Sequence, residues 1–449
     1  MGAGIPLQFT RWVTSPVGQV QMLLALAIAL GGGGVGYGLR NLAVQLAVLL
    51  LLVLQRELVW HFVREAPRVL VTLVLLTLAL PLLQLVPMPA AMWQQLPGRE
   101  PVISAFAIAG IPADSWFPIS LDRGRTLTAF LGLIAPAAII AVGANLGRED
   151  KAAIARFAGL AALAALMIGI FQLSTANTAA LLFPITPKPD VMYATFANRN
   201  STAALFALAL LLLAGAPWWK NRAALLIATV GGALLALGAV LTQSRSGMVL
   251  LLVALGFAGL RAAMAAVARR KGGDGAPRPV WIAALLVAVL VTAAALASAT
   301  LGGRAADSID RFGDTETDRP EVWEDAVFAA REYWPVGSGM GTFDEVFQLH
   351  ESLEYITLRR AGRAHSDWVE IVIEAGAFGI ALVLGWLLWC GWAALRAPAH
   401  WRWTALAAGT GVLALAMQSL LDYPLRSQTL LCIAAVLVVL LAQRRSQKA

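Results

Sequence analysis

About twelve apolar segments, each roughly 15 to 23 residues long, constrain what this chain can fold into. Runs of this length with few charges are typical of helices that cross a bilayer. Only 13% of the residues are charged, whereas a soluble domain is about a quarter charged. The sequence therefore predicts an all-α polytopic membrane protein with about 12 transmembrane helices. The predicted spans are 17–31, 38–55, 69–87, 125–146, 153–172, 200–215, 223–241, 247–265, 280–299, 368–390, 403–420 and 428–442.

The connections between these spans indicate how the helices are oriented. If the N-terminus lies in the cytoplasm, every inner connection and the C-terminal tail carry Lys or Arg, as the positive-inside rule requires. The net charge of +8 has this simple source, and nucleic acid is not an expected partner. We therefore expect both termini in the cytoplasm. The basic residues concerned are Arg56, Arg64, Arg68, Arg148, Lys151, Lys220, Arg222, Arg269, Arg270, Lys271, Arg278, Arg396, Arg402, Arg444, Arg445 and Lys448.

One long polar segment lies between the ninth and tenth predicted spans. By count, residues 301–366 hold 13 of the 26 acidic residues against 7 Arg, on the side of the membrane where such a bias is permitted. The segment is too long and too mixed in composition to be a simple connector. The expected organisation is therefore 1–300 for transmembrane helices 1–9, 301–367 for an outer cap, and 368–449 for helices 10–12 with a cytoplasmic tail.

The cap sequence contains signals for two helices. Asp318 as N-cap and Glu321 three residues later form a capping box, which predicts a helix start. This helix is expected to run to about Tyr333 and to stop before the glycine-rich stretch 337–341. A second helix is expected from about Thr342. The cap should therefore be helical.

Histidine is the first candidate for chemistry. His61 and His400 fall in cytoplasmic connections, whereas His350 and His365 fall in the long outer segment. His365 stands just before the tenth span, where a side chain can face a cleft at the membrane surface. An imidazole is suited to accept a proton near neutral pH, so His365 is the candidate catalytic base. The alternative is an interfacial histidine beside Trp368 of the aromatic belt.

Arginines on the outer face are the second candidate. Arg245 lies between two apolar runs with almost no room for a loop, and Arg is disfavoured on the outer side, so an anionic ligand is worth proposing. Arg199, just before the sixth span, and Arg319, at the start of the cap helix, are further candidates. Several guanidiniums around one pocket suit a diphosphate, because their planar forks bind phosphate oxygens bidentately. The alternatives are snorkelling of Arg245 to lipid headgroups and a structural ion pair for Arg319.

Other chemistries find little support in the sequence. Asp314, Glu316 and Asp318 alternate like the start of a calcium loop, but Arg319 replaces the required Gly and no Glu closes the loop. The glycine-rich stretch 337–341 lacks the Gly-Lys-Ser/Thr of a Walker loop and is not a dinucleotide fingerprint after a strand. We therefore expect no metal and no cofactor.

Six short motifs follow one another between residues 196 and 379. They are Phe196-Ala197-Asn198-Arg199-Asn200, Thr242-Gln243-Ser244-Arg245-Ser246-Gly247, Arg319-Pro320-Glu321-Val322-Trp323, Pro335-Val336-Gly337-Ser338-Gly339-Met340-Gly341-Thr342-Phe343, Ala364-His365-Ser366-Asp367 and Glu374-Ala375-Gly376-Ala377-Phe378-Gly379. In order and spacing this set resembles the O-antigen ligase and polymerase superfamily, over roughly residues 195–385. Where the family often shows Asn after the Ala-His pair, Ser366 and Asp367 occur here, so no role is carried over to these two.

The resemblance implies a function and its residues. Family members move glycans from an undecaprenyl-diphosphate carrier to an acceptor on the periplasmic face of the bacterial inner membrane, without metal. By resemblance, Arg245 and Arg319 correspond to diphosphate-binding arginines, and His365 to the histidine that takes the acceptor proton. The expected partners are an undecaprenyl-diphosphate-linked glycan donor, a lipid A core or growing glycan acceptor, and membrane lipid. The cap and the active site would then be periplasmic.

Two alternatives stay open at this point. Ligase and polymerase share donor, chemistry and topology, so the sequence does not separate them. The alternative from another class is a 12-helix transporter or lipid-linked glycan flippase, which would carry ionisable residues or broken helices at the bilayer midplane. The predicted spans lack Asp, Glu, Lys and Arg near their centres, and the polar segment is placed asymmetrically. These features favour the transferase.

Overall fold

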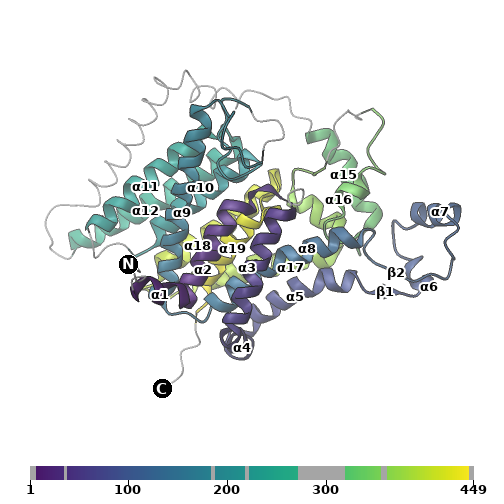
Figure 1. Cartoon of the computed structure of the whole chain (residues 1–449), viewed down its shortest axis with the longest axis horizontal. Helices are drawn as coiled ribbons and strands as arrows, with labels where there is room; N and C mark the ends of the chain where they lie inside the picture. Colours follow the sequence, from purple (N-terminus) through teal and green to yellow (C-terminus); the bar gives the residue numbers. More distant parts are fainter. Residues whose placement is uncertain are drawn as a thin grey trace, which may run out of the picture.

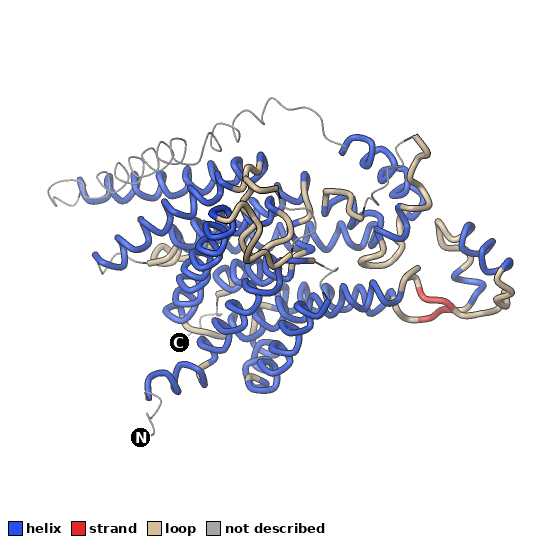
Figure 2. Tube along the Cα trace, turned by 45° about the horizontal axis from the view of Figure 1, so that its top comes forward, coloured by secondary structure: helices blue, strands red, loops and turns tan. Residues whose placement is uncertain are grey.

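The computed structural model describes residues 7–34, 38–183, 188–217, 222–271, 319–354 and 362–443. These residues are mostly helical, with one short antiparallel pairing between β1 (Pro87–Met88) and β2 (Phe117–Pro118). Figures 1 and 2 show a bundle of helices with the cap helices and the β pairing at one end. The predicted span 280–299 and the first part of the cap, 301–318, lie outside the described residues.

Seven of the described helices are long and apolar enough to cross a membrane, and the bent pair α3–α4, with an angle of 76°, would make an eighth. Three shorter apolar helices accompany them. Apart from 280–299, each predicted span coincides with one of these helices, so the chain is a helical polytopic membrane protein. The seven are α2 (Pro16–Leu30), α8 (Arg123–Gly143), α9 (Arg148–Ser174), α11 (Arg222–Leu241), α12 (Arg245–Lys271), α17 (Asp367–Leu395) and α18 (Arg402–Leu421); the others are α3 (Gly38–Leu54), α4 (Arg56–Glu65), α5 (Arg68–Gln84), α10 (Arg199–Gly215) and α19 (Gln428–Leu441).

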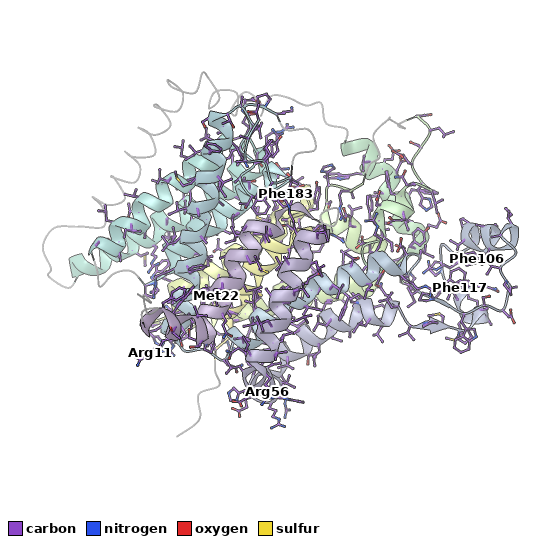
Figure 3. The ribbon with its side chains drawn as sticks, viewed as in Figure 1. Arg11, Met22, Arg56, Phe106, Phe117 and Phe183 are labelled. Atoms are coloured by element: carbon purple, nitrogen blue, oxygen red, sulfur yellow. The ribbon has the colours of Figure 1, made fainter. Side chains whose placement is uncertain are left out.

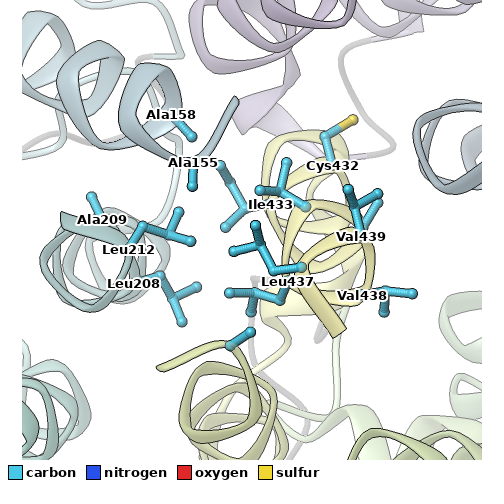
Figure 4. Packing of buried hydrophobic residues seen from close by; sticks show 14 of the residues in the cluster. Ala155, Ala158, Leu208, Ala209, Leu212, Cys432, Ile433, Leu437, Val438 and Val439 are labelled. Carbon is cyan, nitrogen blue, oxygen red and sulfur yellow. The ribbon is translucent and has the colours of Figure 1, made fainter. Parts of the chain in front are cut away.

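Two of the shorter helices form the centre of the bundle. α10 packs against α9, α11, α12 and α18, and α19 packs against α2, α8, α9 and α18. Figure 4 shows Ile433 and Leu437 of α19 facing the alanines of α9 and the leucines of α10. A helix buried on all sides needs apolar residues all round, and α10 has them. Alanine and glycine at these contacts let the helices approach closely.

The connection between α5 and α8 folds back on itself. It contains the β pairing, α6 (Ala90–Trp93) and α7 (Glu100–Ile108), and the rings of Phe106 and Phe117 stack at 4.5 Å between centroids (Figure 3). Arg99 is 1% exposed and donates hydrogen bonds to the carbonyls of Ile119 and Gly337. Burial lowers the pKa of Arg99 to about 10. This buried guanidinium ties the connection to the cap.

The described part of the cap contains the two helices that the sequence predicts. α15 (Arg319–Tyr333) and α16 (Phe343–Phe347) both pack on α17. Their shared core includes Tyr333, Phe343, Phe347 and Ile373. The two cap helices therefore pack directly on the N-terminal part of α17.

A break in α17 explains the glycine-rich stretch before α16. Gly376 lies inside α17 at φ +54°, a left-handed conformation that glycine adopts without the cost other residues bear. The break frees the carbonyls of Ile373 and Glu374, which accept hydrogen bonds from the N–H groups of Ser338 and Gly339, each at 2.9 Å. The stretch 337–341 thus replaces helix hydrogen bonds that α17 lacks.

Close packing in the break also requires small residues. A Cβ on Gly337 would meet the backbone of Glu374, and one on Gly376 would meet the carbonyl of Pro335. Ala377 donates its N–H to that same carbonyl at 2.9 Å. Gln84, at the end of α5, donates from Nε2 to the carbonyl of Glu374 at 2.9 Å. The cap, α5 and α17 are therefore joined at one point.

Candidate active site

His365 lies in the loop that leads into α17. Its backbone adopts φ +52°, which a non-glycine residue rarely does and which costs free energy. Ser366 holds the loop in place: its hydroxyl accepts from the N–H of Val369 and donates to the carbonyl of Ser419, at 3.4 and 3.1 Å. The imidazole is 41% exposed. Within the described residues, its Nδ1 has no hydrogen-bond partner.

A buried carboxylate lies beside this imidazole. Asp422, in the turn after α18, is fully buried, and its Oδ1 lies 3.9 Å from Nδ1 of His365. Asn198 donates from Nδ2 to both oxygens of Asp422, at 3.2 and 3.1 Å. The ring of Tyr423 packs against His365, with 5.3 Å between centroids. The imidazole is therefore flanked by a fixed negative charge and an aromatic ring.

The start of α10 is joined to the same carboxylate. Asn198 caps α10, because its side-chain oxygen accepts from the N–H of Asn200 at 2.8 Å. Its amide group at the same time binds Asp422. Arg199 is the first residue of α10 and is half-buried. One asparagine thus links the start of α10 to the neighbourhood of His365.

The start of α12 lies beside the start of α10. Ser244 donates from its hydroxyl to the side-chain oxygen of Asn200 at 2.7 Å, and it accepts from the N–H of Gly247 at 3.0 Å. Arg245 is the first residue of α12 and is half-buried. A helix N-terminus carries partial positive charge, so two neighbouring N-termini that each begin with a guanidinium favour a bound anion.

The third predicted arginine begins α15. The position of Arg319 as first residue of that helix is described, but its side chain is not among the described ones. One turn later, the indole Nε1 of Trp323 donates to the carbonyl of Ala364 at 2.7 Å. The start of α15 therefore lies against the residue that precedes His365. The segments that carry the four predicted site residues are thus joined at one end of the bundle.

A buried ion cluster at the start of α17 escaped the sequence analysis. Asp367, Glu370 and Glu374 share one face of the helix, since residues three and four apart are neighbours there. Arg426, in η3 (Pro424–Arg426), contacts all three. Its Nε lies 3.3 Å from Asp367 Oδ1 and 3.2 Å from Glu370 Oε2, and its Nη1 lies 2.8 Å from Glu374 Oε2. Arg363 adds a contact of 3.0 Å with Glu370.

The charges of this cluster depend on one another. Burial by itself lowers the pKa of Arg426, but Glu374, Glu370 and Asp367 outweigh burial and raise it above its ordinary value. Arg426 therefore stays charged. Removing one partner of a buried ion pair is strongly destabilising, because the other charge is left unpaired.

A cavity of about 370 Å³ opens beside the cluster, and Arg426, Asp367 and Arg125 are among the residues that line it. Most of its other lining residues are apolar side chains of α5, α8, α17, α18 and α19. Arg125 also pairs with Asp344 and Glu345 of the cap, at 3.3 and 2.8 Å. A mostly apolar space that is also lined by charged side chains suits a lipid chain with a polar head.

The other three histidines, all within the described residues, lie elsewhere. His350 is 6% exposed in the cap, with its Nδ1 3.4 Å from Glu332 and its ring packed edge-on against Tyr333. His61 pairs with Glu65 on α4 at 3.4 Å. His400 is exposed in the connection between α17 and α18. Among the four histidines, His365 alone lies where the predicted segments join.

A known protein family matches the part of the chain that contains most of these site residues. Residues 230–384 match the family model described as O-antigen ligase. Over this segment, about a third of the chain, the protein is similar to O-antigen ligases. The finding confirms the resemblance that the motifs indicate. No curated protein matches the chain.

The matched segment includes Arg245, Arg319 and His365. It also includes α15, α16 and the part of α17 that carries the three buried carboxylates. Arg199, Asp422 and Arg426 lie outside the matched residues, and the fold brings the last two to the start of α17. Residues before and after the matched segment therefore lie next to it in the fold.

Proposed function

We propose that the protein is a glycosyltransferase that moves a glycan from undecaprenyl diphosphate to an acceptor hydroxyl. The observation that carries the proposal is the junction of three motifs. Arg199 and Arg245 begin neighbouring helices, and Asn198 and Asp422 connect these helices to His365. A transfer of this kind requires cations for the leaving diphosphate and a base for the acceptor, and the linked segments carry both residue types.

The arginines are proposed to hold the diphosphate of the donor. When the bond between the anomeric carbon and the phosphate oxygen breaks, negative charge develops on that oxygen. Guanidiniums fixed at that oxygen stabilise the transition state more than the ground state. Arg319 is proposed as a third contact, because it begins α15 next to the His365 loop and lies in the matched segment. Such a leaving group needs no acid.

His365 is proposed as the base for the acceptor. Its imidazole takes the proton of the acceptor hydroxyl while that oxygen attacks the anomeric carbon, and this single displacement inverts the carbon. The carboxylate of Asp422, 3.9 Å away, would stabilise the positive charge that the ring gains. No step in this scheme uses a metal or a cofactor.

The apolar helical bundle is an argument for lipid-linked substrates. The cavity beside the cluster is proposed to take the apolar chain of one substrate, with the glycan directed toward the cap. The site would face the periplasm of a bacterial inner membrane, with both termini in the cytoplasm. The acceptor is either lipid A core, for a ligase, or a growing glycan, for a polymerase.

The direct test uses purified protein with a lipid-diphosphate glycan and an acceptor. His365→Ala should lower turnover by about 100- to 10,000-fold and leave donor binding unchanged, because a base contributes to rate and little to carrier binding. His400→Ala, at an exposed inner position, is the matched control. Transfer by His365→Ala at the wild-type rate would show that the histidine mechanism is wrong.

A deletion strain separates the two transferase types. Long carrier-bound chains that no longer reach lipid A core indicate a ligase, whereas single repeat units on the acceptor indicate a polymerase. Wild-type surface and carrier-bound polysaccharide in the deletion strain would contradict both.

The proposed orientation has its own test. Cys390 and Cys432 are free and buried, so an added surface cysteine should dominate labelling. Leu353→Cys, at a cap position 87% exposed, should react with a membrane-impermeant maleimide in cells whose inner membrane is intact. Arg396→Cys, at the other end of α17, should react only after the inner membrane is opened. Equal labelling of both before opening would contradict the orientation.

One observation favours the transporter or flippase alternative. α17 is broken at Gly376, and broken helices are typical of transporters. In this protein, however, Ser338, Gly339 and Gln84 bind the carbonyls freed by the break, so they do not face an ion path. Carrier-linked glycan crossing a liposome membrane, without transfer to an acceptor, would support the alternative.

A further inference from the structure

We propose that Arg426 is a positioning residue for His365. Through the buried cluster it fixes the position of the imidazole relative to the carboxylate of Asp422. The inference deepens the proposed function and rests on it for the role of His365. Arg426 is not expected to touch the reacting atoms. Its guanidinium binds carboxylates that in turn hold the backbone on both sides of His365.

The residue before His365 is held by one of these carboxylates. The N–H of Ala364 donates to Oε1 of Glu370 at 3.1 Å. The other oxygen of Glu370 lies 3.2 Å from Nε of Arg426 and 3.0 Å from Arg363. The position of this backbone therefore depends on Glu370 remaining where its two cations place it.

The residues after His365 are held by a second carboxylate. Asp367 accepts hydrogen bonds at Oδ2 from the hydroxyl of Ser419 and the N–H of Leu425, and its Oδ1 pairs with Arg426. The N–H of Asp367 donates to the carbonyl of Asp422 at 3.1 Å. Hydrogen bonds of Asp367 thus join the His365 loop to the turn that carries Asp422.

Arg426 belongs to the same turn as Asp422, four residues further along the chain. One guanidinium therefore connects the turn that carries the carboxylate to the helix that follows the imidazole. The left-handed backbone of His365 needs such support, since strained conformations persist only where the surroundings determine them.

Loss of the guanidinium would change the charge balance. Three carboxylates would then face Arg363 alone, and their repulsion would displace the start of α17. Because His365 precedes that start directly, its imidazole would move relative to Asp422. A displacement of about 1 Å at a reacting group costs on the order of 100-fold in rate.

The first measurement compares turnover with donor binding. Arg426→Met should lower kcat on the order of 100-fold with donor binding unchanged. Arg426→Lys should keep part of the rate, because an ammonium keeps the charge but loses the planar fork. The double variant Arg426→Met with Glu374→Gln should recover part of the lost turnover rate. The glutamine removes one unpaired charge and still accepts a hydrogen bond from the N–H of Phe343. Arg396→Met, at the exposed inner end of α17, is the control and should transfer normally.

The second measurement does not depend on transfer. Diethyl pyrocarbonate modifies neutral imidazoles, and mass spectrometry of the peptide that carries His365 gives its rate of modification at each pH. His365 is 41% exposed and therefore reachable by the reagent. Arg426→Met should shift the pH profile of this modification, and Arg426→Lys should shift it less. His350, whose side chain is 6% exposed in the core of the cap, should stay protected in every variant whose fold is intact.

The outcomes separate the possibilities. A wild-type kcat and an unchanged His365 profile in folded Arg426→Met would overturn the inference. Weaker donor binding with kcat unchanged would also overturn it, because Arg426 would then contact a ligand through the cavity that it lines. If wild-type protein transfers no glycan, the proposed function falls, and the shift of the His365 profile alone decides whether Arg426 positions this side chain.

Discussion

Nδ1 of His365 lies 3.9 Å from Oδ1 of Asp422, close enough for a strong charge interaction and too far for a direct hydrogen bond. Asp422 comes from the turn after α18, whereas His365 precedes α17, so the pair exists only because the fold joins the two helices there. Catalytic hydrogen bonds are often long before substrate binds. The pair is therefore an arrangement that a bound acceptor could tighten.

Asp422→Asn should lower turnover roughly 10- to 100-fold while donor binding stays unchanged, because the imidazole loses the charge that stabilises and orients it. Asparagine keeps the size of the side chain and an oxygen that can accept from Asn198. Steady-state kinetics and a separate donor-binding measurement check this. Asp150→Asn, exposed in the first turn of α9, is the control, and an equal kcat in both variants would exclude a role for Asp422.

Arg245→Ala and Arg199→Ala should each weaken donor binding by about 1.5 to 3 kcal/mol, since each removes a hydrogen-bonding charge. This corresponds to roughly 10- to 100-fold in Kd. Lys at either position should restore only part of the donor affinity, because an ammonium lacks the planar fork of N–H donors of a guanidinium. Donor titration in lipid nanodiscs measures the effect, with Arg402→Ala at the inner end of α18 as control. Unchanged Kd in both variants would place the diphosphate elsewhere.

Gly376→Ala should destabilise the protein by at least about 2 kcal/mol, because an L residue at φ +54° is strained and its Cβ would meet the carbonyl of Pro335. Gly391→Ala, in the same helix with no atom within 4 Å of the added Cβ, should be neutral or slightly stabilising. Thermal unfolding of both variants in detergent provides the comparison. If Gly376→Ala is as stable as Gly391→Ala, the break in α17 is not as described.

Transfer should persist in excess EDTA. The proposed steps use arginines and a histidine, and within the described residues there is no group of three or more His, Cys, Asp or Glu arranged to hold a metal ion. The measurement is the initial transfer rate before and after chelation. Activity that is lost to EDTA and restored by magnesium or manganese would require a catalytic ion in the mechanism.

The apolar segments predicted most of the bundle, because a helix that crosses a bilayer needs an uninterrupted apolar run of sufficient length. The two cap helices could also be predicted from the sequence, because the local patterns that include Glu321 and Thr342 mark where these helices begin. Each of these signals lies within a few residues of the structure that it specifies.

The candidate site could be predicted only in part, because several of its contacts join residues that are far apart in the sequence. Asp367, Glu370 and Glu374 have the spacing of one helix face, so their proximity to each other could be inferred from sequence. Their partner Arg426 lies 52 to 59 residues later, in a turn whose position is fixed by packing. The link from Asn198 to Asp422 spans 224 residues and has no local signal at all. Contacts of this kind appear only with the three-dimensional structure.

The hydrogen bonds from Ser338 and Gly339 into the break of α17 have a consequence for protein engineering. The cap is not a module that can be exchanged by cutting at its two ends, because its backbone completes the hydrogen bonding of a membrane helix and meets Gln84 at the same point. A chimera that takes the cap of a relative must also take that relative's residues at positions 84 and 373–377. A graft cut at 319 and 366, with a backbone that does not match the break, would leave main-chain carbonyls of α17 without donors, and a buried carbonyl without a donor costs free energy.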